Sequence, residues 1–205
     1  MKDLGNLKYF LGIEFARSKE GINMHKRKYA LEFISKDGLS AAKHTSTPID
    51  TTPIDTNIKL TSTINDKVIC TKSQVEKDLL VDQATYQRLI GKLLYLTVTR
   101  HDISFGVQTL SQFLQQHKQS HMTATLRIVR YIKNQPGRGI LLSSKTSNVV
   151  TAYCDVDWAA CPITRRSVTC FLIKIGDSLG SWKSKKQITF SRSSAEVELE
   201  VLQQL

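Results

Sequence analysis

Hydrophobic and polar positions change their spacing along the chain, and each change marks a different predicted element. Residues 7–15 and 21–25 are rich in aromatic and β-branched side chains, and a short polar stretch separates the two runs. This arrangement predicts a β-hairpin. Apolar residues then recur at helical spacing over residues 29–36 and are followed by an Asp-Gly pair, which predicts a helix and its end.

The middle of the chain follows a helical period. Apolar residues recur every three or four positions over 86–96, 103–114 and 121–134. Such spacing lines them up on one side of a helix, so three helices with apolar faces that form core are predicted. Asp102 precedes the second stretch and is its expected N-cap.

Basic side chains flank the apolar stripe of the third predicted helix. At 100° per residue, Arg127 and Arg130 project about 140° and 80° from Met122, onto an exposed edge. Lys133 falls back towards the stripe, where its aliphatic stem can cover apolar surface. Two interpretations stay open for the arginines: contact with nucleic-acid phosphates, or plain solvated charge.

The segment before these helices is predicted to be irregular, and the segment after them is predicted to contain strands and a helix. Residues 44–84 are rich in Thr, Ser, Asp and Pro, which predicts an irregular connection. Strand patterns return over 149–155, 167–175 and 179–183, and a helix is predicted over 194–205. We expect this last unit to be poorly stable alone, with uncovered apolar side chains on its helix at Val197, Val201 and Leu202.

Acidic residues gather in that last unit. A strand has a side-chain period of two, so Asp155 and Asp157 are expected on one face. The plain interpretation of these acids is the solvated end of a strand. Glu196 fits a capping box with Ser193, whereas Glu198 lies beyond the cap and is the better metal-ligand candidate. Mg²⁺ prefers such hard oxygen ligands.

Charge and cysteine content narrow the class of partner. The formal net charge is +11 and the sequence pI is about 9.6, which favours a polyanionic partner such as nucleic acid. Residues 101–150 hold six Lys/Arg against one acid, and residues 151–205 hold seven against six. No apolar run suits a membrane span or a signal peptide. Four cysteines without zinc spacing indicate reduced thiols in an intracellular protein, cytoplasmic or nuclear.

Four motifs near the C-terminus carry a family resemblance. They are Tyr-Cys-Asp-Val-Asp-Trp-Ala-Ala-Cys-Pro (153–162), Thr-Arg-Arg-Ser (164–167), Ser-Trp-Lys-Ser-Lys-Lys-Gln (181–187) and Ser-Arg-Ser-Ser-Ala-Glu-Val-Glu (191–198). Their order and spacing resemble the ribonuclease H domain of copia-type LTR retrotransposon Pol polyproteins. The resemblance implies a ribonuclease H fold that cuts the RNA of an RNA–DNA hybrid with two Mg²⁺ ions. It implies Asp155 and Glu198 as catalytic, metal-binding carboxylates, with Asp157 as a doubtful extra ligand.

The resemblance extends over the rest of the chain. Residues 2–14 and 28–29 resemble the segment after the polymerase site of copia-type reverse transcriptases, and residues 86–103 and 121–133 resemble the thumb and connection region. The family's Tyr-Val-Asp-Asp polymerase motif would lie upstream of Met1, and its two further ribonuclease H aspartates would lie beyond the end of this chain. Both active sites are therefore expected to be incomplete here.

These observations predict an α+β or α/β protein in four parts. Residues 1–43 are the end of the palm and start of the thumb, 44–84 an irregular connection, 85–148 a helical thumb/connection region, and 149–205 a truncated ribonuclease H-like sheet and helix. The nucleic-acid-binding candidates are Arg127, Arg130, Lys133, Arg165 and Arg166.

The predicted function is that of a Pol polyprotein fragment, inactive as this chain. The alternatives are a non-enzymatic basic nucleic-acid-binding module or an inert element remnant. The expected partners are an RNA–DNA hybrid or other nucleic acid and the remaining polyprotein segments, with no membrane.

Overall fold

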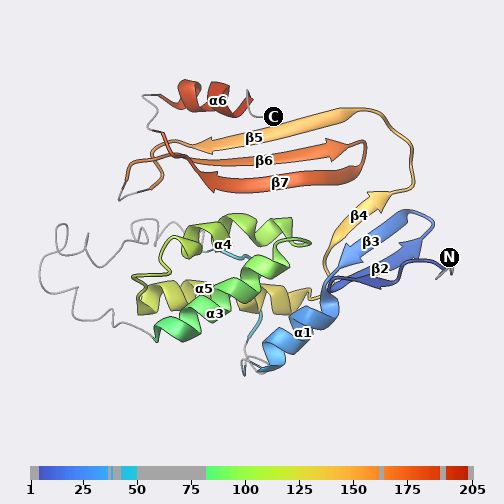
Figure 1. Ribbon diagram of the computed structural model, residues 1–205, viewed down its shortest axis with the longest axis horizontal. Coiled ribbons are helices and arrows are strands. Elements are labelled where there is room, and N and C mark those ends of the chain that lie inside the picture. The colour runs from blue at the N-terminus through green and yellow to red at the C-terminus, as the bar shows by residue number, and fades with distance from the viewer. Residues whose placement is uncertain are drawn as a thin grey trace, which may run out of the picture.

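Helices and two antiparallel sheets make up the protein. The computed structural model describes residues 5–36, 38, 43–49, 82–161, 164–189 and 193–202. The four-stranded sheet has the order β1-β2-β3-β4, and the three-stranded sheet has the order β5-β6-β7. Figure 1 shows the main helices lying beside the first sheet and below the second. The irregular connection predicted over 44–84 falls largely outside the described residues, and residues 43–49 contain no helix or strand.

The first sheet confirms the predicted hairpin and adds two strands to it. Its strands are β1 (Tyr9–Phe10), β2 (Ile13–Ser18), β3 (Gly21–His25) and β4 (Ile140–Ser143). The run over 7–15 was expected to be one strand, but Leu11 and Gly12 have φ of 48° and 76° and form a turn between β1 and β2. β4 was not predicted, because it lies within the region expected to be helical and pairs with the distant β3.

The helices pack around a common apolar core, as their periodicity predicts. They are α1 (Arg27–Lys36), α3 (Gln83–Leu96), the 3₁₀ helix η3 (His101–Ile103), α4 (Ser104–Ser111) and α5 (Gln119–Asn134). The buried apolar side chains that all four α-helices and η3 contribute to this core include Phe33, Ile34, Tyr86, Leu89, Ile90, Leu93, Ile103, Val107, Leu110, Ile128, Val129 and Ile132. No helix in the described part of the chain combines the length and apolar character that crossing a membrane requires.

Two aspartates near the starts of these helices have different roles. Asp82 caps α3, since its carboxylate accepts a hydrogen bond from the Thr85 backbone N–H at 2.9 Å. The prediction that Asp102 caps the next helix is wrong, because Asp102 lies inside η3 and its carboxylate accepts two 2.9 Å bonds from the Arg100 guanidinium. Arg100 is 2% exposed, and its buried charge needs an ion-pair partner. The Asp102 carboxylate therefore binds this guanidinium and does not cap the helix.

The second sheet is a meander of β5 (Val150–Asp157), β6 (Val168–Ile175) and β7 (Ser178–Lys186). One face of this sheet meets the helices. The Trp182 indole N–H donates to the Thr97 carbonyl at 3.2 Å, and Lys186 Nζ lies 3.2 Å from the Gln112 amide oxygen. The sheet is therefore tied to both α3 and the end of α4.

Helix α6 (Ser194–Leu202) packs along β5. Figure 1 draws it on the side of the sheet that faces away from α3, α4 and α5. The Ser193 hydroxyl accepts from the Glu196 backbone N–H at 3.2 Å, which confirms the predicted cap. Val197 is fully buried, so the expectation that it lies uncovered is wrong, and the side chains of Val201 and Leu202 fall outside the described residues.

Candidate functional site

The acidic end of β5 faces the helices. Asp155 pairs with Cys170 of β6, which in turn pairs with Ser184 of β7, and the Cys170 thiol donates to the Ser184 hydroxyl at 3.3 Å. Residues paired directly across antiparallel strands share a face. Tyr153, Asp155 and Trp182 therefore lie on one side of the sheet, as the period of two predicts. Burial raises the pKa of the Cys170 thiol, and the nearby charges of Asp155 and Asp157 raise it further.

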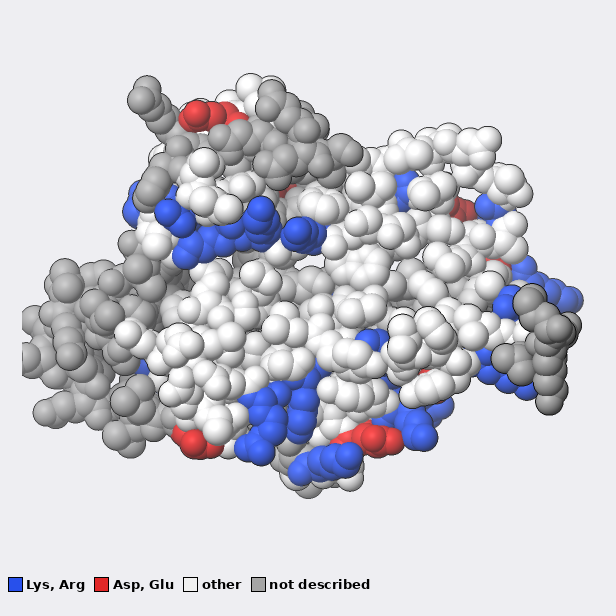
Figure 2. Space-filling view, viewed as in Figure 1, with Lys and Arg blue, Asp and Glu red and all other residues white. Residues whose placement is uncertain are grey.

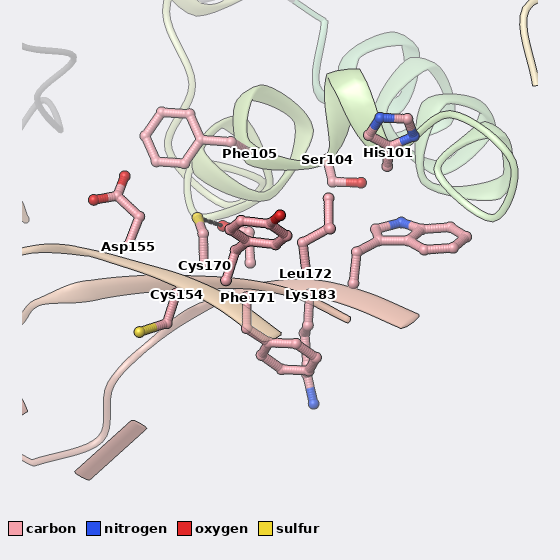
Figure 3. A pocket seen from close by; sticks show the side chains of 12 residues that line it. His101, Ser104, Phe105, Cys154, Asp155, Cys170, Phe171, Leu172 and Lys183 are labelled. Atoms are coloured by element: carbon pink, nitrogen blue, oxygen red, sulfur yellow. Dashed lines mark hydrogen bonds between the residues drawn. The ribbon is translucent and has the colours of Figure 1, made fainter. Parts of the chain in front are cut away.

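The structure does not bring Asp155 together with Glu198. Figure 3 shows the Asp155 carboxylate pointing from the sheet towards the helix that carries Phe105. Glu198 is an exposed residue of α6, which lies on the other side of this sheet. Asp157 shares the Asp155 face but sits two positions along the strand, about 6.7 Å further on.

The magnesium site that the resemblance implies on these carboxylates stays a prediction. Mg²⁺ demands near-octahedral oxygen ligands about 2.0–2.1 Å away. Among the described residues, no three His, Cys, Asp or Glu side chains gather closely enough to hold a metal ion. Asp155 and Asp157 remain as solvent-exposed acids on one face, without Glu198 opposite them.

A hollow of about 230 Å³ lies between the helices and this face of the sheet. Its walls include His101, Ser104 and Phe105 on the helical side, and Tyr153, Asp155, Leu172 and Trp182 on the sheet side. The side chains of Cys154, Phe171 and Lys183 point away from it (Figure 3). The hollow is therefore largely aromatic, with a carboxylate on one wall.

Within the described part of the chain, two polar atoms at this hollow are buried without a hydrogen-bond partner: His101 Nδ1 and Ser104 Oγ. Burial lowers the pKa of His101, and the positive charges of Arg138 and Arg100 lower it too, while Asp102 opposes them. The imidazole is therefore neutral at pH 7. Its ring meets the Trp182 ring edge-to-face, with the centroids 6.1 Å apart.

A second hollow of about 520 Å³ adjoins the first through Phe105, which lines both. Its other walls include Thr109 of α4, Asp157, and Trp158 to Ala160 at the end of β5. Arg165 lines it as well and is exposed, with a backbone φ of 51°. This hollow therefore places one cation beside the aromatic pocket.

Three of the predicted phosphate-binding residues are not well exposed. Arg127, Arg130 and Lys133 of α5 are all half-buried. Arg127 Nη2 donates to the Thr47 hydroxyl at 3.0 Å, so the segment 43–49 covers this edge of the helix. The prediction that the two arginines occupy an exposed edge is wrong, because helical periodicity did not reveal that covering segment.

Two exposed lysines on β7 offer charge that the sequence analysis had not singled out. Lys183 and Lys185 alternate with Trp182 and Ser184, so both project from the face of the sheet opposite the helices. No ion pair joins either lysine to a carboxylate in the described structure. Figure 2 shows Lys and Arg gathered in a band along this part of the second sheet. The signal was present as lysines at i and i+2, although the strand predicted over 179–183 ended before Lys185 and β7 continues to Lys186.

Comparison with known proteins gives relatives but no structural neighbour. No family model matches the chain, and no solved structure does. An uncharacterized mitochondrial protein of Arabidopsis thaliana is 34% identical over 202 residues, which cover 98% of this chain and 77% of that protein.

Longer relatives match over the same extent of this chain. The retrovirus-related Pol polyprotein from transposon RE1 of Arabidopsis thaliana is 34% identical over 198 residues. The corresponding polyprotein from transposon TNT 1-94 of Nicotiana tabacum is 28% identical over 201 residues. Both matches cover 97% of this chain but only 12% and 14% of the polyproteins.

Proposed function

The chain belongs to the family of copia-type retrotransposon Pol polyproteins, and we propose that it binds nucleic acid without cutting it. In this proposal, residues 5–143 correspond to the end of the reverse transcriptase and its thumb/connection region. Residues 150–202 correspond to the start of the ribonuclease H-like sheet and helix. The ligand is an RNA–DNA hybrid, and other segments of a Pol polyprotein are candidate partners.

The observation that carries the proposal is the pair of exposed lysines on β7. Lys183 and Lys185 point the same way and lie two residues apart, which is about 6.7 Å along a strand. Flexible ammonium groups at that separation can contact phosphates of one backbone. The formal net charge of +11 favours the approach of a polyanion as well.

The position of the acids supports binding without cleavage. Two-metal cleavage requires carboxylates that hold two ions about 3.5–4 Å apart. Of the two carboxylates implied for that role, Asp155 points from the sheet towards the helices, whereas Glu198 belongs to α6 on the other side of the sheet. The residues described here therefore support contacts to the backbone better than they support hydrolysis.

Binding is tested by fluorescence anisotropy of a labelled RNA–DNA hybrid at several salt concentrations. Each lost phosphate contact lowers the magnitude of the slope of log K against log salt by about 0.9 for a duplex. The double variant Lys183→Gln/Lys185→Gln should therefore reduce the slope by about 2. A control, Lys8→Gln/Lys19→Gln, removes the same charge from two exposed lysines at the first sheet and should leave the slope nearly unchanged.

The competing catalytic function is tested on the same hybrid. Incubation with Mg²⁺ should yield no cleavage that depends on Asp155. Cleavage that disappears in Asp155→Asn would overturn the non-catalytic part of the proposal. A chain that neither binds nor cuts would overturn the proposal as a whole and favour an inert element remnant.

A further inference from the structure

We propose that the hollow between the helices and the second sheet is a pocket for one unpaired nucleobase. For convenience it is called the base pocket, and its defining residues are His101, Ser104, Phe105, Tyr153, Asp155 and Trp182. The inference deepens the proposed nucleic-acid binding and rests on it for the source of the base. It assigns to Asp155 a role in ligand recognition that needs no metal.

The shape and the walls of the base pocket suit a single ring system. Its volume of about 230 Å³ is below the roughly 300–1,000 Å³ typical of clefts for drug-sized ligands. Trp182 and Tyr153 line the sheet side, and Phe105 lines the helical side. Aromatic side chains of this kind stack on the faces of unpaired bases with little dependence on sequence.

The unpartnered polar atoms give the pocket a hydrogen-bonding edge. His101 Nδ1 and Ser104 Oγ are both buried without a partner in the described structure, although buried polar groups normally have one. A neutral imidazole nitrogen either donates or accepts, and a hydroxyl does both. Both atoms have almost no exposed area, so a change of side-chain rotamer has to turn them towards the hollow, where they can pair with the neighbouring donor and acceptor of a base edge. A purely apolar ligand would leave both of them unsatisfied.

The charges around the pocket orient the rest of a nucleotide. Asp155 is exposed on the pocket wall, where its carboxylate can accept a bond from an exocyclic amino group but repels a phosphate. Arg165 lines the adjoining hollow, on the other side of Phe105, where its guanidinium can contact the phosphate of the bound nucleotide. The geometry thus favours a base held inside and its phosphate held outside.

Free nucleosides test the pocket, because they carry the base without the backbone charge. The sequence contains two tryptophans, so Trp158→Phe leaves Trp182 as the only indole reporter. In that background, titration with adenosine, guanosine, cytidine and uridine should give saturable quenching of Trp182 emission by at least one of them. The affinity should be the same at low and high salt, since the ligand is uncharged.

Two substitutions probe the wall atoms against one matched control. Ser104→Ala removes a hydrogen-bonding group and should weaken nucleoside binding about three- to tenfold. Asp155→Asn should strengthen the binding of a 5′-monophosphate several-fold relative to its nucleoside, because it removes the charge that repels phosphate. Cys154→Ser changes a neighbouring side chain that points away from the pocket and should leave the affinity unchanged. Equal urea midpoints for all variants establish that each is folded.

The outcomes separate this inference from the proposed function. If the hybrid binds through Lys183 and Lys185 but no nucleoside quenches Trp182, the base pocket is wrong and the proposed function stands. If nucleosides bind and the hybrid does not, the proposed function fails and the pocket remains. Quenching by toluene as strong as quenching by nucleosides, or no effect of Ser104→Ala, would reduce the pocket to an apolar cavity and overturn the inference.

Discussion

Replacing Asp102 by asparagine removes the charge that compensates a buried arginine. The Arg100 side chain is 3% exposed and the Asp102 side chain 11%, and their closest nitrogen and oxygen atoms are 2.9 Å apart. Arg100 also donates to the Gln135 carbonyl at 2.9 Å, so the guanidinium cannot swing out to water without breaking a contact to the end of α5. The substitution leaves this cation buried beside a neutral amide.

The expected cost follows from that burial. Breaking one side of a buried ion pair typically costs about 3–5 kcal/mol, because the remaining charge stays desolvated. With a urea m-value of about 2–3 kcal/mol/M, the unfolding midpoint should fall by about 1–2.5 M. Arg138 reaches the same carboxylate at 3.5 Å but is 44% exposed, so Arg138→Ala should cost less than about 1 kcal/mol.

The pH dependence of stability provides an independent check on the same group. Burial alone would raise the pKa of Asp102, but the hydrogen bonds and charge of Arg100, together with Tyr131 and Arg138, hold that pKa below its ordinary value of 3.8. A lowered folded-state pKa means that the stabilisation is complete above about pH 4 and is lost as the pH falls through the folded value. The stability difference between wild type and Asp102→Asn should therefore stay constant from pH 8 to about pH 5, and shrink below about pH 4.

The measurement is urea unfolding followed by far-UV circular dichroism at several pH values. A midpoint for Asp102→Asn that matches Arg138→Ala at pH 7 would refute the reasoning, since it would mean that the buried pair contributes no more than an exposed one. A difference from wild type that grows as the pH falls would refute it as well.

Three further substitutions test the fold. Gly21→Ala should lower the free energy of unfolding by about 1–3 kcal/mol or more, because Gly21 has a φ of 143° and an added Cβ would meet the Leu142 carbonyl of β4. The control Gly180→Ala, where the nearest atom to an added Cβ is 3.6 Å away, should change it by less than about 0.5 kcal/mol in urea unfolding. Asp82→Ala should lower the melting temperature, because it removes the oxygen that caps α3. Asp82→Asn should lower it less, because the amide oxygen can still accept the Thr85 N–H bond; equal effects would contradict the capping role. Trp182→Phe replaces the indole by a smaller aromatic ring and loses the N–H bond to the Thr97 carbonyl at the C-terminal end of α3. Limited proteolysis should then cut the second sheet sooner, and unchanged cutting would argue against that tie.

Local patterns in the sequence predicted the elements that bury a continuous apolar face. The helices that became α3 and α5 were predicted within a few residues, and so were β5 and β6, because their periodicity directly reflects which side chains turn inward. β4 escaped prediction, because four residues carry too little pattern and the strand depends on a partner far away in the chain. Such pairing is a property of the tertiary structure.

In the candidate site, too, the sequence predicted what depends on one strand and missed what depends on how distant segments pack. The period of two correctly placed Asp155 and Asp157 on one face of β5, since that depends on the strand alone. It did not reveal which side of the sheet α6 would take, and so it could not place Glu198. Arg127 illustrates the same limit, because its covering segment lies 80 positions earlier in the sequence.

The pairing of β3 with β4 sets a constraint on how the chain assembles and how it responds to cutting. Gly21 and Ser143 are register partners although about 120 residues separate them, and closing a loop of that size costs about 2 kcal/mol more entropy than closing a ten-residue hairpin. During synthesis the N-terminal hairpin must wait for nearly three quarters of the chain before its outer edge is paired. Conversely, a single protease nick between the two strands would not release the N-terminal piece, because the ladder would hold both halves as a non-covalent pair.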